Sequence, residues 1–145
     1  MASLKKSLVK KGYVQIPVKI TKTNHMVVKV KLNGVKGRFI LDTGASNSCV
    51  GFDQVAQFLI ETSESEVKAA GAGAVGMETR NSQDNTLKMA GWKTKKCNLV
   101  IFDMSHVNEA LIAHGAKPIN GIIGADILRS GKAIIDYKND CFYLK

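Results

Sequence analysis

The sequence contains few cysteines and no long apolar run, and it has no acidic residue before position 42. Its three cysteines, Cys49, Cys97 and Cys141, are an odd number at wide spacings. Because neither a disulfide framework nor a metal-ligand pattern emerges, we expect a cytoplasmic protein without a metal or other cofactor. The apolar runs are too short to span a bilayer, and no apolar stretch follows the lysines of residues 1–11. We therefore expect neither a membrane span nor a secretory signal.

The missing acidic residues leave the charge unevenly distributed. The formal net charge is +9, and residues 1–41 hold ten Lys and Arg side chains, whereas the rest of the chain holds eleven basic and twelve acidic ones. Such an excess can mark a surface for nucleic acid or an acidic partner. However, these lysines alternate with valine and isoleucine and not with aromatics that stack on bases. The pattern favours a solvated lysine face, with salt-dependent nucleic-acid binding through residues 1–41 as the alternative.

At 145 residues, 45% of them apolar, the chain is the size of one globular domain. We divide it into a mobile basic leader, residues 1–12, and a folded domain, residues 13–145. Alternating or β-rich patterns predict strands at residues 13–20, 26–32, 35–41, 47–50, 97–102, 133–137 and 141–144. Pro17 indicates a sheet edge, and Asn33-Gly34 predicts a tight hairpin. With short helices expected at residues 52–60 and after Gly124, the predicted fold is mostly β with one or two short helices.

Two segments are left open by their composition. Residues 61–90 are polar and then rich in glycine and alanine, so a flexible hairpin and a disordered loop fit equally well, with order returning at Leu87. Residues 104–114 are either helical or irregular. The three histidines show no ligand spacing, and we expect them to be surface or core residues.

The most informative stretch is residues 39–46, Phe-Ile-Leu-Asp-Thr-Gly-Ala-Ser. Three apolar residues predict a buried strand, and Thr43-Gly44 predicts a tight turn at its end. Asp42 thus lies where the strand leaves the core, a costly place for a lone carboxylate unless hydrogen bonds or another ionisable group share its environment. A glycine backbone can approach closely and offer N–H donors to it. A plain strand followed by an Asp turn is the competing interpretation.

This stretch resembles the active-site motif of the aspartic proteases, and the order of features resembles single-domain, retropepsin-like members of the bacterial type. In that family a glycine-rich flap follows the acid–Thr–Gly turn, and a pair of aliphatics before glycine supports the catalytic loop. Here the corresponding segments are residues 71–76 and Ile122-Ile123-Gly124. The resemblance implies a retropepsin-like half-barrel. It also implies catalytic roles for Asp42, Thr43 and Gly44, and substrate contacts for Ala45, Gly71, Gly73, Gly76 and Ile122.

Aspartic protease chemistry needs two carboxylates that share one proton and one water. Only one acid–Thr–Gly motif is present, and Asp126 follows Gly-Ala at the start of an expected helix. The resemblance therefore implies a homodimer in which two copies of Asp42 meet on a two-fold axis, with a peptide or protein as substrate.

Two departures from the retroviral pattern concern the dimer, and one departure from the pepsin-like pattern concerns the flap. Ala125-Asp126 occupies the place of a basic residue, the chain ends in a predicted hairpin instead of one strand, and the glycine-rich segment has no aromatic residue. The alternative function is a catalytically silent dimerisation or peptide-binding module, because a fold does not guarantee an activity. Phosphoryl transfer through Asp42 would need a larger α/β frame and further acids, which this sequence lacks.

Overall fold

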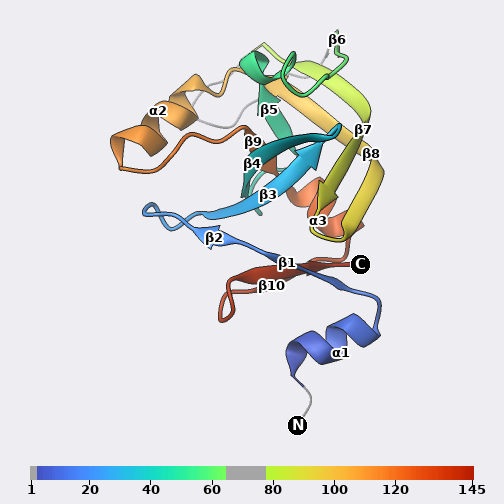
Figure 1. Ribbon diagram of the computed structural model, residues 1–145. Helices are drawn as coiled ribbons and strands as arrows, with labels where there is room; N and C mark the ends of the chain where they lie inside the picture. Colours follow the sequence, from blue (N-terminus) through green and yellow to red (C-terminus); the bar gives the residue numbers. More distant parts are fainter. Residues whose placement is uncertain (1–2, 65–77) are drawn as a thin grey trace.

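The computed structural model describes residues 3–64 and 78–145, and these residues are mostly β (Figure 1). The helices are α1 (Leu4–Lys10), α2 (Ser105–Ala113) and α3 (Ala125–Ser130), and a 3-10 turn η1 spans Phe52–Gln54. The strands are β1 (Val14–Pro17), β2 (Lys19–Ile20), β3 (Met26–Leu32), β4 (Val35–Leu41), β5 (Cys49–Gly51), β6 (Ser63–Glu64), β7 (Arg80–Met89), β8 (Trp92–Phe102), β9 (Gly121–Ile123), β10 (Ile134–Asp136) and β11 (Cys141–Leu144).

The larger sheet has the strand order β2-β3-β4-β9-β5-β8-β7-β6. An additional pairing joins β3 to β7, so that β3, β4, β9, β5, β8 and β7 close into a mixed barrel. Side chains alternate along β3: Val28, Val30 and Leu32 enter the interior, and Lys29 and Lys31 face outward. The predicted mostly β fold is confirmed.

The β3–β4 hairpin forms as its sequence predicts. Leu32 pairs with Val35, so the loop is the two residues Asn33 and Gly34, both with positive φ (51° and 83°). This backbone matches the twist of the flanking strands, and glycine adopts it without strain. The Asn33 side chain donates to the Phe58 carbonyl and to Asn85 Oδ1, each at 2.9 Å. The hairpin tip is thereby attached to two other segments of the barrel.

A second, three-stranded sheet has the order β1-β11-β10. β1 is an edge strand, as Pro17 indicated, and β10 and β11 are the predicted C-terminal hairpin. One face of this sheet contributes Ile16, Phe142 and Leu144 to the main core.

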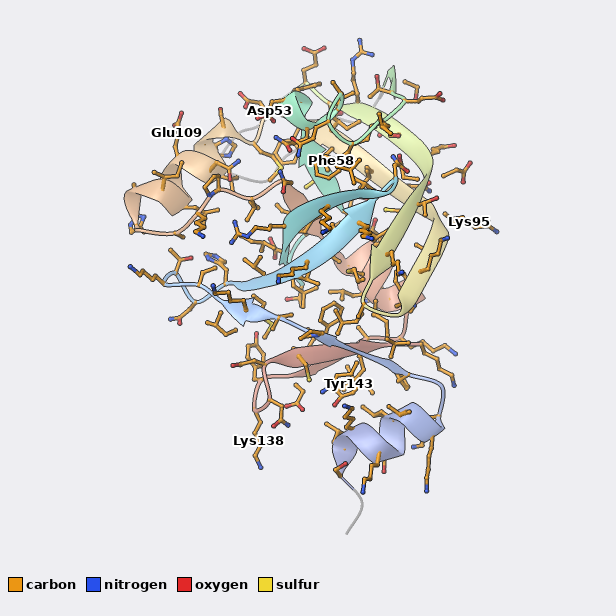
Figure 2. All side chains as sticks on the ribbon, viewed as in Figure 1. Asp53, Phe58, Lys95, Glu109, Lys138 and Tyr143 are labelled. Carbon is orange, nitrogen blue, oxygen red and sulfur yellow. The ribbon has the colours of Figure 1, made fainter. Side chains whose placement is uncertain are left out.

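The N-terminal segment corrects the expectation of a mobile leader. Residues 4–10 form α1, which begins with Ser3 accepting a hydrogen bond from the Lys6 N–H at 3.1 Å. Leu8 is buried against Cys141 and Tyr143 on the outer face of the three-stranded sheet, and Tyr143 lies between the sheet and the helix (Figure 2). The sequence did not reveal this contact, because two leucines, Leu4 and Leu8, among several lysines are too few to indicate a buried helix face.

Other boundaries also differ from the expectations. Residues 52–60 begin with the short 3-10 turn η1 and continue as turns, in place of a short α-helix. Among the described residues of the segment 61–90, β6 and β7 are regular strands, and β7 already begins at Arg80, before the expected Leu87. Residues 105–113 are helical, which settles the alternative left open for that segment. No helix among the described residues is long and apolar enough to cross a membrane.

The packing places the C-terminal end of β4 at one end of the barrel. β9 lies between β4, to which it is parallel, and β5, to which it is antiparallel. The chain therefore leaves β4 at Leu41, passes over the end of β9 through residues 42–48, and enters β5. α2 packs on a smaller core cluster that includes Val27, Ile40 and Ile122, and Ala45 of this loop packs against the same cluster. The loop over β9 is the part of the fold that carries Asp42.

Candidate active site

Asp42 is the first residue after β4, and its backbone and side chain are both fixed. Its N–H donates to the Ile123 carbonyl at 2.9 Å, which extends the β4–β9 ladder by one residue. The Gly44 N–H donates to Asp42 Oδ1 at 2.9 Å, and the Ala45 N–H donates to the Asp42 carbonyl at 3.2 Å. The carboxylate is partly exposed. One of its oxygens is thus held by the turn, and the carboxylate is presented at the surface.

The loop that carries Asp42 rests on the backbone of Gly124. A Cβ at this position would lie 2.7 Å from the Ala45 carbonyl oxygen and 2.8 Å from the Asn47 backbone. The next N–H, of Ala125, donates to the same Ala45 carbonyl at 2.7 Å. The two chains approach so closely that only glycine fits, which explains the aliphatic-aliphatic-glycine pattern in physical terms.

A buried polar network fixes the far end of this loop. Ser48 is fully buried, and its hydroxyl donates to Asp126 Oδ1 at 2.8 Å and accepts from the Gly124 N–H at 2.9 Å. The Ser48 N–H donates to both carboxylate oxygens of Asp126, at 3.0 Å each. Asp126 also accepts from the Ile127 N–H at the start of α3. The carboxylate expected to flank a helix therefore also ties α3 to the loop that follows Asp42.

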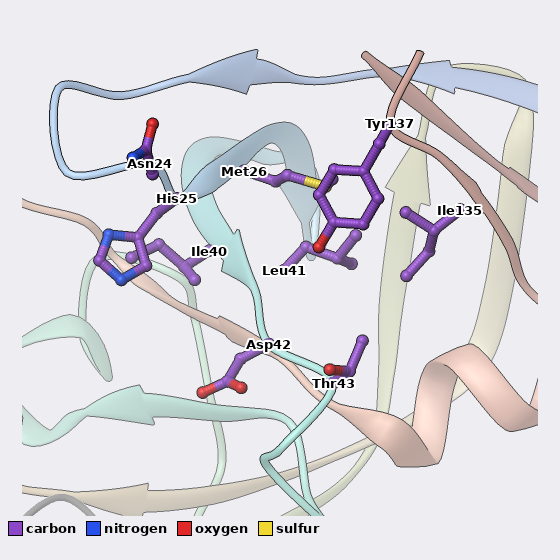
Figure 3. A pocket seen from close by; sticks show the side chains of 9 residues that line it. All are labelled: Asn24, His25, Met26, Ile40, Leu41, Asp42, Thr43, Ile135 and Tyr137. Atoms are coloured by element: carbon purple, nitrogen blue, oxygen red, sulfur yellow. The ribbon is translucent and has the colours of Figure 1, made fainter. Parts of the chain in front are cut away.

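Two hollows adjoin the turn. The first, of about 230 Å³, is lined by Asn24, His25, Met26, Ile40, Leu41, Asp42, Thr43, Ile135 and Tyr137 (Figure 3). In Figure 3 the ring of Tyr137, on the turn after β10, lies over Leu41, and the Asp42 carboxylate projects below it. The second, more open hollow, of about 540 Å³, is lined by Thr43, Ala125, Leu128, Arg129, Lys132, Ala133 and Ile135. Thr43 and Ile135 belong to both, so the turn separates two concave surfaces.

His25 and Tyr137 in the first hollow were not found from the sequence. His25 shows no ligand spacing in the sequence, yet the β2–β3 turn places it in the same hollow as Asp42, with its Nδ1 2.7 Å from Thr23 Oγ1. Tyr137 is 76% exposed, which is unusual for a large aromatic side chain. Both lie on turns distant in the sequence from Asp42. Their place in the first hollow depends on the pairing of β2 with β3 and of β10 with β11, which the sequence alone does not give.

Burial and nearby carboxylates control the chemistry of Cys49. Burial, followed by the charges of Asp126 and Asp42, raises the pKa of the Cys49 thiol to about 12. The thiol is therefore protonated at neutral pH and is a poor nucleophile. Among the described residues no group of three or more His, Cys, Asp or Glu side chains could hold a metal ion.

The structure brings some of the expected site residues together. Asp42, Thr43, Gly44 and Ala45 form one turn at the end of the barrel where β4 ends. Ile122 pairs with Ile40 on the neighbouring strand, is 9% exposed, and packs with Ile40 in the smaller core cluster. The three expected flap glycines lie outside the described residues: Gly71, Gly73 and Gly76.

The barrel, the acid–Thr–Gly turn and the glycine beneath it define a retropepsin-like protein. The sequence matches the aspartyl protease family over residues 28–127, most of the chain, and the chain belongs to that family. No curated protein matches it significantly.

Three solved structures share the fold at low sequence identity. The retroviral protease-like domain of Ddi1 from Leishmania major is 17% identical with a TM-score of 0.59, and the match covers 83% of this chain and 88% of that one. A retropepsin-like aspartic protease from Rickettsia conorii is 15% identical with a TM-score of 0.59, and 91% of each chain is covered. The EIAV protease complexed with the inhibitor HBY-793 is 23% identical with a TM-score of 0.50, covering 76% of this chain and 90% of that one.

Proposed function

We propose that this protein is an aspartic endopeptidase that acts as a homodimer and activates a water between two Asp42 carboxylates. The observation that carries the proposal is the Asp42 turn: one oxygen of the carboxylate accepts from the Gly44 N–H, and the side chain borders an open hollow. Membership of the aspartyl protease family supports this use of the carboxylate.

The proposed reaction follows from two carboxylates at hydrogen-bonding distance. Like charges about 3 Å apart do not both ionise, so the pair of Asp42 side chains holds one proton. The ionised carboxylate accepts a proton from the water as it attacks the scissile carbonyl carbon, and the protonated one donates to the carbonyl oxygen. Both titrations belong to the pair. The Gly44 N–H keeps one oxygen in place, and no covalent intermediate with the enzyme forms.

The surface around Thr43 supports a dimer on this side of the molecule. For two copies of Asp42 to meet, the two-fold axis must pass beside the turn, so the partner must cover Thr43. The Thr43 hydroxyl is exposed and has no hydrogen bond within the described residues. β10 is an edge strand of the three-stranded sheet, and its Ile135 lines both hollows. We assign the dimer contact to Thr43, the second hollow and the β10 edge.

The first test is Asp42→Asn, measured by cleavage of a peptide library and by sedimentation. The amide keeps the shape and accepts from Gly44 but cannot hold or share the proton, so we expect the dimer to persist and cleavage to fall by at least about 10³-fold. Asp84→Asn is the matched control, because Asp84 is an exposed acid on β7 outside the site. Turnover equal to that of the unmodified protein in Asp42→Asn would overturn the proposal.

The second test is the response to a pepstatin-type inhibitor. An inhibitor that occupies the shared cleft binds both subunits and should shift sedimentation toward the dimer by mass action. A strict monomer that ignores the inhibitor would support the silent binding module in place of the enzyme.

A further inference from the structure

The outer face of the barrel carries a row of four lysines on four adjacent strands. Lys36 of β4 pairs with Lys31 of β3, Lys31 pairs with Lys88 of β7, and Lys88 pairs with Lys93 of β8. All four side chains are exposed. Since neighbouring strands lie about 4.8 Å apart, the row is about 14 Å long. We call these four residues the lysine row.

The row of residues next to the lysine row shows that the lysines occupy the outward positions of the sheet. One residue along each strand, Val35, Leu32, Leu87 and Thr94 pair in the same order; Leu32 and Leu87 are buried in the core, and Val35 packs against it. The lysines are thus the outward positions of a sheet whose inward positions form the core. Further basic side chains continue the surface: Lys29 lies two residues from Lys31, and Lys95 points away from β8 into solvent (Figure 2).

The four strands that carry the lysine row hold a single acidic residue. β3, β4 and β8 carry no acidic residue, and the one acid of β7, Asp84, lies at a bulge four residues from Lys88. Like charges directly opposite each other across strands destabilise a sheet. Three such pairs in one row therefore oppose folding, and a bound polyanion would relieve the repulsion.

We propose that the lysine row binds the phosphate backbone of duplex nucleic acid without sequence preference. The alternation of lysine with valine and isoleucine in residues 1–41 favoured a solvated face, but strand pairing places Lys88 of β7 and Lys93 of β8 in the same row. Lysine is depleted in protein–protein interfaces, where arginine and aromatics are enriched, so an all-lysine face does not fit a protein partner well. It has no aromatic side chain for stacking single-stranded bases. Closely spaced phosphates of a duplex match a row of cations.

The test measures the anisotropy of a labelled 20-base-pair DNA duplex between about 50 and 200 mM NaCl. We expect the logarithm of the binding constant to fall linearly with the logarithm of salt concentration. Lys31→Gln combined with Lys88→Gln should reduce that slope by about 2 and weaken binding at about 100 mM salt by about tenfold or more. The melting temperature of this variant should stay the same or rise, because the substitution removes a like-charge pair. Weaker DNA binding by this variant would therefore not result from unfolding.

The matched control is Lys117→Gln combined with Lys138→Gln, which removes the same charge from exposed sites away from the lysine row. It should weaken binding by less than about threefold, since general net charge has only a screened effect. Equal losses in the two double variants, or no binding at the lowest salt, would overturn the proposal. So would tighter binding to polyglutamate or to anionic phosphatidylserine vesicles at equal charge concentration. Asp42→Asn should bind DNA unchanged, so this result is independent of the proposed proteolysis.

Discussion

Replacing Ser48 by alanine tests how the loop that carries Asp42 is held. The substitution removes one hydroxyl that donates to Asp126 and accepts from the Gly124 N–H. A buried donor left without an acceptor costs about 1–3 kcal/mol, and a hydrogen bond to a charged group contributes about 1.5–3 kcal/mol. Because the Ser48 N–H still donates to Asp126, we expect the free energy of unfolding to fall by about 2–4 kcal/mol.

The assay is urea unfolding at one fixed protein concentration, since dimerisation would make stability concentration-dependent. Ser46→Ala is the matched control: Ser46 is an exposed serine of the same loop, and we expect a change within about 0.5 kcal/mol. In a cycle with Asp126→Ala, the two sites should couple by at least about 0.5 kcal/mol. If Ser48→Ala proved as stable as Ser46→Ala, the network would not hold the loop and the reasoning would be refuted.

Three further predictions concern other parts of the fold. Hydrogen bonds from Asn139, chiefly from its side chain, lower the pKa of Asp136. Their contribution to the stability of the fold is therefore present above about pH 4 and is lost as the pH falls through the folded-state pKa. The fall in melting temperature caused by Asn139→Ala should therefore be largest at pH 6 and become smaller in acid. An equal fall at pH 6 and in acid would contradict this. Gly121→Ala should lower the melting temperature, at a cost of about 1–3 kcal/mol, because the new Cβ would lie 2.5 Å from the Cys49 carbonyl oxygen and 2.6 Å from the Phe39 ring. Cys49 should react with a thiol reagent only after unfolding, and rapid labelling of the native protein would exclude the buried, protonated thiol.

The sequence predicted the parts of the fold that local chemistry determines. β3, the Asn33-Gly34 loop and β4 follow from an alternating pattern and a turn that needs two positive φ angles. The place of Asp42 at the end of a buried strand follows from three apolar residues before it. The C-terminal hairpin follows from two β-rich runs around a polar turn.

The sequence could not predict what long-range pairing decides. The approach of Gly124 to Ala45 depends on β9 entering between two strands that are far away in the sequence. Ser48 and Asp126 are 78 residues apart, and neither has an unusual sequence context. The burial of Leu8 depends on a sheet formed by both ends of the domain.

Subunit mixing tests the central claim most directly, that one active site contains Asp42 from two chains. Unmodified protein and Asp42→Asn are mixed at a constant total concentration, allowed to exchange subunits, and assayed for peptide cleavage. If each site needs both carboxylates, activity falls as the square of the unmodified fraction, and an equal mixture retains about one quarter of the activity. An equal mixture that retains about one half would show that each chain acts alone.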